Sequence, residues 1–126
     1  MKANIFLLLL LSVCHFTACS QNTVKEVGGP CEGCEAIHES PVPFDQLKSS
    51  VVLPDYNDAG PKIHVRGTVY QVDGKTPAAG VVLYVYHTDQ KGIYPIKGNE
   101  KGWSKRHGYI RGWDKTDDKG FYEFYT

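Results

Sequence analysis

Apolar and polar residues alternate along most of the second half of the chain. Between residues 63 and 71, the apolar residues Ile63, Val65 and Val69 are separated by polar or aromatic ones. Successive side chains of a strand point to opposite faces, so this period of two predicts a half-buried strand. The same pattern predicts further strands at residues 81–87, 109–113 and 121–126, and a short edge strand at residues 51–53.

Between these strands the sequence has turn and loop composition. Turns are predicted at residues 73–75 and 114–120, and a long polar loop at residues 88–108. Prolines make residues 40–61 an extended connection rather than a helix. Since no segment has the sustained 3.6-residue period of a helix, residues 62–126 are predicted to form an all-β, antiparallel β-sandwich.

The last predicted strand has no turn or polar tail after it. Phe121, Glu123 and Tyr125 alternate with their neighbours as far as Thr126. A β-sandwich of the immunoglobulin type uses about seven strands, and fewer are found here. We therefore expect the sandwich to be incomplete at its C-terminus.

The N-terminus has the layout of an export signal. Lys2 precedes an almost unbroken apolar run from Ile5 to Val13, which is too short to span a bilayer as a helix. Small residues then lead to Cys19, as in the lipobox of bacterial lipoproteins. We predict a signal peptide at residues 1–18 and lipidation of Cys19, which would anchor an exported protein in the cell envelope. The alternative is an ordinary signal peptide that is cut nearby.

Two further cysteines, Cys31 and Cys34, form a C-x-x-C motif. In an exported protein the first interpretation is a small structural disulfide. A metal half-site is the second, although His38 is the only nearby candidate for a further ligand. Catalytic redox activity is the third, but the βαβ pattern that usually accompanies it is absent.

Overall charge excludes one class of partner. The chain has 14 basic and 14 acidic side chains, so nothing favours nucleic acid. Residues 19–61 are predicted to be a tether and a Pro-rich segment with the two cysteines, ahead of the partial domain at residues 62–126.

Two motifs of the predicted domain describe architecture. The first is Gly67–Tyr86, with the pattern Gly-x-Val, a turn and Pro-x-x-Gly-Val-x-Leu, and the second is Thr116–Phe124, with Thr-Asp-x-x-Gly-x-Tyr-x-Phe. The pair occurs in many exported β-sandwiches, including carboxypeptidase-regulatory-like modules, which have no catalytic activity. A non-enzymatic envelope module with a binding or structural role is therefore the alternative function.

The segment between these motifs favours an enzyme. Tyr86 ends a predicted strand, and Tyr94 follows eight residues later in a Gly-x-Tyr sequence. In this respect the chain resembles the intradiol ring-cleavage dioxygenases, relatives of protocatechuate and catechol dioxygenases, with Tyr86 in the place of a frequent Trp. The segments 109–113 and 124–126, and the C-x-x-C region, are similar to an exported lipoprotein branch of that family.

The resemblance implies a non-haem ferric site and a ring-opening reaction. Two Tyr and two His ligands hold Fe(III) in the family, because phenolate stabilises the ferric state, and a catechol-type substrate reacts there with O₂. Only Tyr94 can be carried over as a ligand. The family's second Tyr and its His-x-His pair follow the strand that includes Thr126, so this chain is expected to be inactive alone. His87 and His107 could substitute, but isolated histidines on a β surface are more often hydrogen-bonded than metal-bound.

Overall fold

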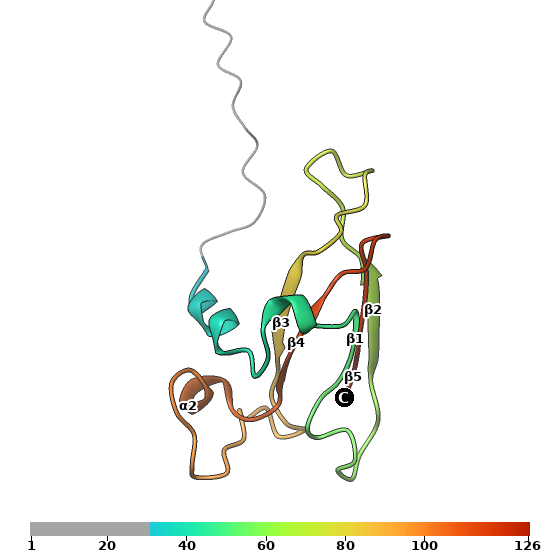
Figure 1. Ribbon diagram of the computed structural model, residues 1–126. Coiled ribbons are helices and arrows are strands. Elements are labelled where there is room, and N and C mark those ends of the chain that lie inside the picture. Colours follow the sequence, from blue (N-terminus) through green and yellow to red (C-terminus); the bar gives the residue numbers. More distant parts are fainter. Residues whose placement is uncertain (1–30) are drawn as a thin grey trace, which may run out of the picture.

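The computed structural model describes residues 31–126. The predicted signal peptide at residues 1–18 and the predicted lipidation site at Cys19 lie outside these residues. Five strands form two sheets (Figure 1): β1 (Ser50–Val52), β2 (His64–Thr68), β3 (Val82–Tyr86), β4 (Arg111–Lys115) and β5 (Phe121–Tyr125). Within residues 31–126, no helix is long and apolar enough to cross a membrane.

The fold is mostly β-structure, as predicted, and each predicted strand region contains a strand. The bounds differ most for β2, which ends at Thr68, three residues before the predicted end at residue 71. β4 begins and ends two residues later than predicted, so Asp114 and Lys115 belong to this strand and the turn prediction was wrong for these two residues. The turn at residues 73–75 forms as expected, because Asp73 Oδ1 accepts hydrogen bonds from the backbone amides of Lys75 and Thr76, both at 2.9 Å. In Figure 1 the chain around this turn projects beyond the sheets.

Three short helical segments also occur. They are the 3₁₀ helices η1 (Cys34–Glu39) and η2 (Phe44–Gln46) and one α-helical turn, α2 (Ser104–His107). The prediction of loop without helix was wrong at residues 44–46 and 104–107. A single turn is too short to show a helical period in the sequence.

The first sheet has the order β1-β5-β2, and the second pairs β3 with β4. β2 and β5 are antiparallel, as are β3 and β4, but β1 and β5 are parallel, with Ser50 opposite Glu123. The prediction of a wholly antiparallel fold was therefore wrong. The chain reverses direction between β1 and β2, and β5 lies between them, so β5 must run parallel to one of the two.

The segment before residue 62 contributes to this arrangement. It supplies β1, and two of its side chains belong to the small set of buried apolar residues: Ala36, Leu53, Ile110, Trp113 and Phe124. A side chain added at Gly112 in β4 would lie 2.5 Å from Leu53 Cδ2. The two sheets therefore meet where β1 and Leu53 pack against β4.

Candidate functional site

Tyr94 lies in a loop that an aspartate organises. Asp89 Oδ1 accepts hydrogen bonds from the backbone amides of Lys91 and Ile93, at 2.8 and 3.0 Å. Gly92, between these two residues, has φ 76°, a conformation that favours glycine. These contacts direct the chain back toward β3, so that the Tyr94 ring lies 5.5 Å from the Tyr86 ring. Tyr94 remains 43% exposed.

Behind Tyr94 lies a group of aromatic rings that we call the aromatic cluster: Tyr84, Tyr86, Trp103, His107 and Trp113. His107 is at its centre. Its ring stacks on Tyr86, with centroids 3.9 Å apart and planes 11° apart, and also on Trp103, at 5.3 Å. The helical turn α2 carries His107 to the end of β3, so residues 21 apart in sequence become stacking partners.

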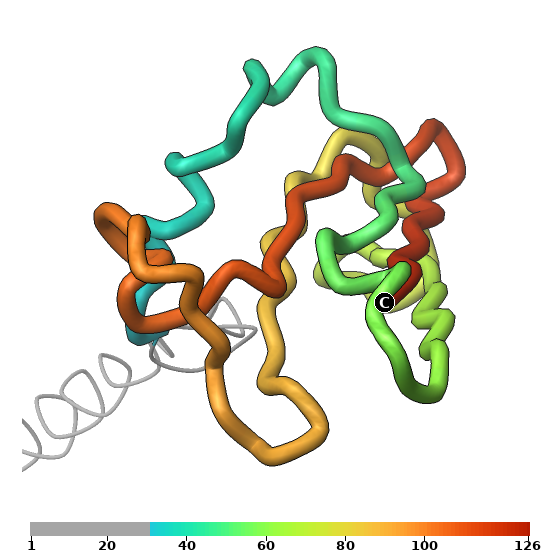
Figure 2. The backbone as a smooth tube through the Cα atoms, turned by 90° about the horizontal axis from the view of Figure 1, so that it is seen from below, coloured from blue at the N-terminus to red at the C-terminus, as the bar shows by residue number. Residues whose placement is uncertain are grey.

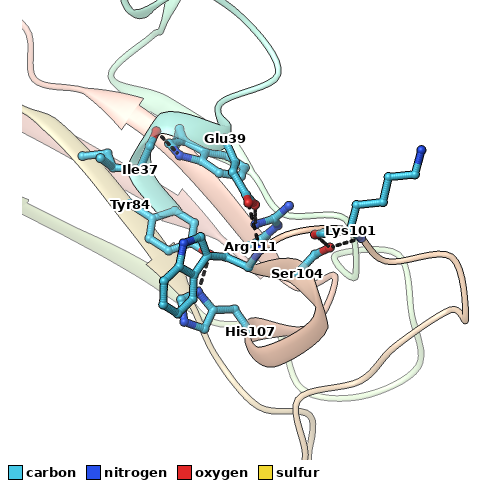
Figure 3. Close-up of polar contacts among 9 residues, drawn as sticks. Ile37, Glu39, Tyr84, Lys101, Ser104, His107 and Arg111 are labelled. Carbon is cyan, nitrogen blue, oxygen red and sulfur yellow. Dashed lines mark hydrogen bonds and ion pairs between the residues drawn. The ribbon is translucent and has the colours of Figure 1, made fainter. Parts of the chain in front are cut away.

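The edges of the His107 ring are also in contact with protein. Nδ1 lies 2.9 Å from the Tyr84 hydroxyl, as Figure 3 shows. On the other edge, a side chain at Gly33 would lie 3.1 Å from both Cε1 and Nε2. Burial, with the nearby charges of Arg111 and Arg106, lowers the pKa of His107. The imidazole is therefore a neutral, enclosed part of the cluster.

An ion pair borders the cluster. Arg111 Nη1 donates to Glu39 Oε2 at 2.7 Å, and the backbone amide of Trp103 donates to Glu39 Oε1 at 2.8 Å (Figure 3). Burial alone would raise the pKa of Glu39, but these two hydrogen bonds and the Arg111 charge outweigh it and lower the pKa. Glu39 is therefore held as a carboxylate.

The pKa of Tyr84 shifts in the opposite direction, upward. Burial raises the pKa of its phenol, and the neighbouring Arg111 only partly offsets this effect. Tyr84 is thus held as a neutral phenol that can hydrogen-bond His107.

His87 lies apart from Tyr94 and the aromatic cluster. Its Nδ1 donates to the Thr88 carbonyl at 2.7 Å, and its Nε2 is 2.6 Å from the Thr126 hydroxyl, which in turn lies 2.9 Å from Asp55 Oδ1. These residues border a cavity of about 440 Å³ that Tyr94 does not line. The hydrogen bonds tie the ends of β3 and β5 to the chain that follows β1.

Within residues 31–126, no three His, Cys, Asp or Glu side chains form a group that could hold a metal ion. His107 stacks on Tyr86 and its Nδ1 lies 2.9 Å from the Tyr84 hydroxyl, while His87 is hydrogen-bonded to Thr88 and Thr126.

Cys31 and Cys34 are joined by a disulfide, with Cα atoms 5.7 Å apart. The pair begins a segment that we call the strap, residues 31–39, which runs alongside α2 (Figure 2). At the far end of the strap, the Ile37 carbonyl accepts a hydrogen bond from Trp113 Nε1 at 2.9 Å.

Sequence reasoning missed Asp114. It lies on β4 and is 0% exposed, and both carboxyl oxygens are buried without a hydrogen-bond partner among the described residues. Burial raises its pKa to about 7. The sequence pattern placed Asp114 in the turn predicted at residues 114–120, whereas it lies in β4, so the pattern gave no sign of its burial. Glu39 and Arg111 were missed because their partnership spans residues that are distant in sequence.

No protein-family model matches the chain, and no curated protein matches it. The likeness to intradiol dioxygenases therefore rests on the motifs and their spacing.

Proposed function

We propose that this chain belongs to an intradiol ring-cleavage dioxygenase-like protein. The complete protein would bind Fe(III) and open catechol-type rings with O₂. It would be exported and anchored in the cell envelope through lipidated Cys19. The two sheets would be the first part of a β-sandwich of the intradiol dioxygenase type.

One observation carries this proposal: Tyr94 is exposed at the edge of a rigid support. The eight-residue spacing from Tyr86 matches the family's first ligand, and the two rings are 5.5 Å apart. Tyr86 is in turn fixed by its stack on His107. A ligand positioned by packed neighbours, with its own side chain accessible, suits a metal site.

The iron would act as a Lewis acid that templates and activates the substrate. In this chain, Tyr94 would hold the metal and Tyr86 would orient Tyr94. The remaining ligands would follow β5, as a Pro-x-Pro-Tyr segment and a His-x-His pair.

Titration with Fe(III) tests the proposal in two steps. The 126-residue chain alone is expected to show neither a tyrosinate-to-iron charge-transfer band nor catechol ring opening. A chain extended along the reading frame beyond Thr126 is expected to show both, and Tyr94→Phe in that longer chain should lose or strongly shift the band.

The matched control is Tyr70→Phe, because Tyr70 is similarly exposed, at 51%. It should leave the band of the longer chain unchanged. A coloured, active 126-residue chain would overturn the proposed division of ligands. An unchanged band in the Tyr94→Phe variant would overturn the role of Tyr94.

The packing of His107 favours the alternative, a non-enzymatic envelope β-sandwich. Its ring stacks on Tyr86 and Trp103, and its Nδ1 lies 2.9 Å from the Tyr84 hydroxyl, contacts that are more typical of a structural core than of a metal ligand. A reading frame that ends after Thr126, or that continues into an adhesive domain, would decide for this alternative.

A further inference from the structure

The two ends of the strap contact the aromatic cluster in different ways. At the C-terminal end, Glu39 accepts hydrogen bonds from Trp103 and Arg111, and the Ile37 carbonyl accepts one from Trp113. Ala36 beside them is 0% exposed. This end is therefore secured by polar contacts and burial that do not involve the cysteines.

The N-terminal end depends on a close approach of one glycine. Gly33 is buried with φ 79°, and an added Cβ would lie 3.1 Å from the rings of both His107 and Trp103. Apart from the disulfide, residues 31–33 have two polar contacts within residues 31–126: the Ala36 amide donates to the Gly33 carbonyl at 3.1 Å, and Glu32 pairs with Arg106 at 3.3 Å. The Glu32–Arg106 pair is exposed and contributes little.

Both cysteines are exposed, although Gly33 between them is buried. The bond that constrains this end is thus open to solvent, whereas the residue that it positions touches the cluster. We propose that Cys31–Cys34 is a thiol–disulfide exchange site for dithiols, and that its reduction releases Gly33 from His107 and Trp103. This inference does not depend on the proposed dioxygenase function.

The exchange is a balanced two-electron reaction. A thiolate of the dithiol attacks one sulfur of the Cys31–Cys34 bond, forming a mixed disulfide and expelling the other cysteine as a thiolate. The second thiol of the dithiol then attacks the mixed disulfide. Cys31 and Cys34 end as two thiols after proton uptake, and the dithiol ends as a disulfide.

Reduction of the disulfide opens the ring of residues 31–34 and restores backbone freedom to Gly33. Glycine has more conformations to lose on ordering than any other residue. Once the disulfide no longer restricts Gly33, ordering this residue costs more backbone entropy. Its packing on His107 must then offset that larger cost. The Glu39 end has no such dependence, so we expect local release of residues 31–33 while the rest of the strap stays in place.

The test combines alkylation with NMR of the full chain in dithiothreitol. Differential alkylation and peptide mapping should show that Cys31 and Cys34 become reactive, and the mapping distinguishes them from Cys14 and Cys19. The chain has two tryptophans, so each indole signal can be followed separately. Reduction should shift the Trp103 indole and His107 ring signals, whereas the Trp113 indole signal should stay constant.

Two variants test the contact of Gly33 with the cluster separately from the reduction of the disulfide. Cys31→Ser/Cys34→Ser should give the shifted Trp103 and His107 signals without reductant. Gly33→Ala should give them with the disulfide intact, because the methyl group would lie 3.1 Å from both rings and φ 79° disfavours Ala. Glu35→Gln is the matched control, since Glu35 is exposed in the same segment, and it should behave as wild type.

Two results would overturn the proposal. Resistance of Cys31 and Cys34 to excess dithiothreitol in the folded chain would show that they are not an exchange site. Complete reduction with unchanged Trp103 and His107 signals would show that the disulfide does not control the contact of Gly33 with the cluster.

Discussion

Strands β2 and β4 have the same length but opposite relations between composition and burial. β2 has apolar Val65 and follows apolar Ile63, yet these side chains are 46% and 53% exposed. β4 contains Asp114, which is 0% exposed, and half-buried Arg111. In these two strands, burial depends more on the segments that pack against the strand than on the polarity of its own residues.

The coverage of the two strands explains the difference. One face of β4 contacts the strap and the aromatic cluster through Trp113, and the other contacts Leu53 through Gly112. β2 pairs only with β5 and lies at the edge of its sheet. Four substitutions test this comparison.

Asp114→Asn is expected to have the largest effect, and that effect depends on pH. Burial raises the pKa of Asp114 from 3.8 to about 7, so the native state keeps a proton that the unfolded chain releases. The wild-type free energy of unfolding should therefore fall as the pH rises from about 4 to about 7. A shift of about three pKa units corresponds to about 4 kcal/mol.

Asn cannot ionise, so Asp114→Asn should lack this fall. Urea unfolding of both proteins across the pH range provides the measurement. Parallel profiles for the two proteins would contradict a buried, unpaired carboxyl group in β4.

Gly112→Ala should destabilise the protein by about 1–3 kcal/mol, the usual cost of overpacking. The new methyl group would meet the buried Leu53 side chain, at 2.5 Å from Cδ2. Gly67→Ala in β2 is the matched control, because its nearest neighbour is the end of the Tyr122 side chain, which can move. Equal losses in chemical denaturation would contradict the difference in coverage between the two strands.

Glu39→Gln should cost about 1 kcal/mol near neutral pH, because it removes the charge that Arg111 faces. The pKa of Glu39 is lowered from 4.5 in the folded protein, so its contribution is present above about pH 4.5 and is lost as the pH falls. The difference between wild type and variant should shrink in acid. Glu32→Gln, in the exposed pair with Arg106, should show no measurable change at any pH.

Val65→Thr should have the smallest effect, within about 0.5 kcal/mol, because an exposed side chain loses little on becoming polar. Thr also keeps the β-branched shape that suits a strand. Thermal or urea unfolding measures it. A loss as large as that of Gly112→Ala would mean that the apolar side of β2 is covered in solution.

Local patterns predicted which segments would be strands. Alternation placed all five strand regions with ends no more than three residues from the observed ones, and Asp73 marked a turn through its own hydrogen bonds. Tyr86 and Tyr94 were also identified from spacing, and the structure brings their rings together. Such features depend on residues that are near one another in sequence.

Pairings between distant residues were not predictable in this way. His107 belongs to the Tyr86 stack and His87 does not, although both had been equal candidates as metal ligands. The parallel β1–β5 pairing, the Glu39–Arg111 ion pair and the approach of Gly33 to His107 likewise have no local signal.

The sequence by itself determined the strand segments, the turns and the chemical identity of Tyr94, because alternation and turn chemistry act over a few residues. Only the tertiary structure decided that Asp114 would be buried and Val65 exposed. Burial is a property of what packs against a residue, and here the covering residues come from the strap and from β1, tens of residues away. The alternating pattern defined the two faces of each strand, and tertiary packing determined which face is buried.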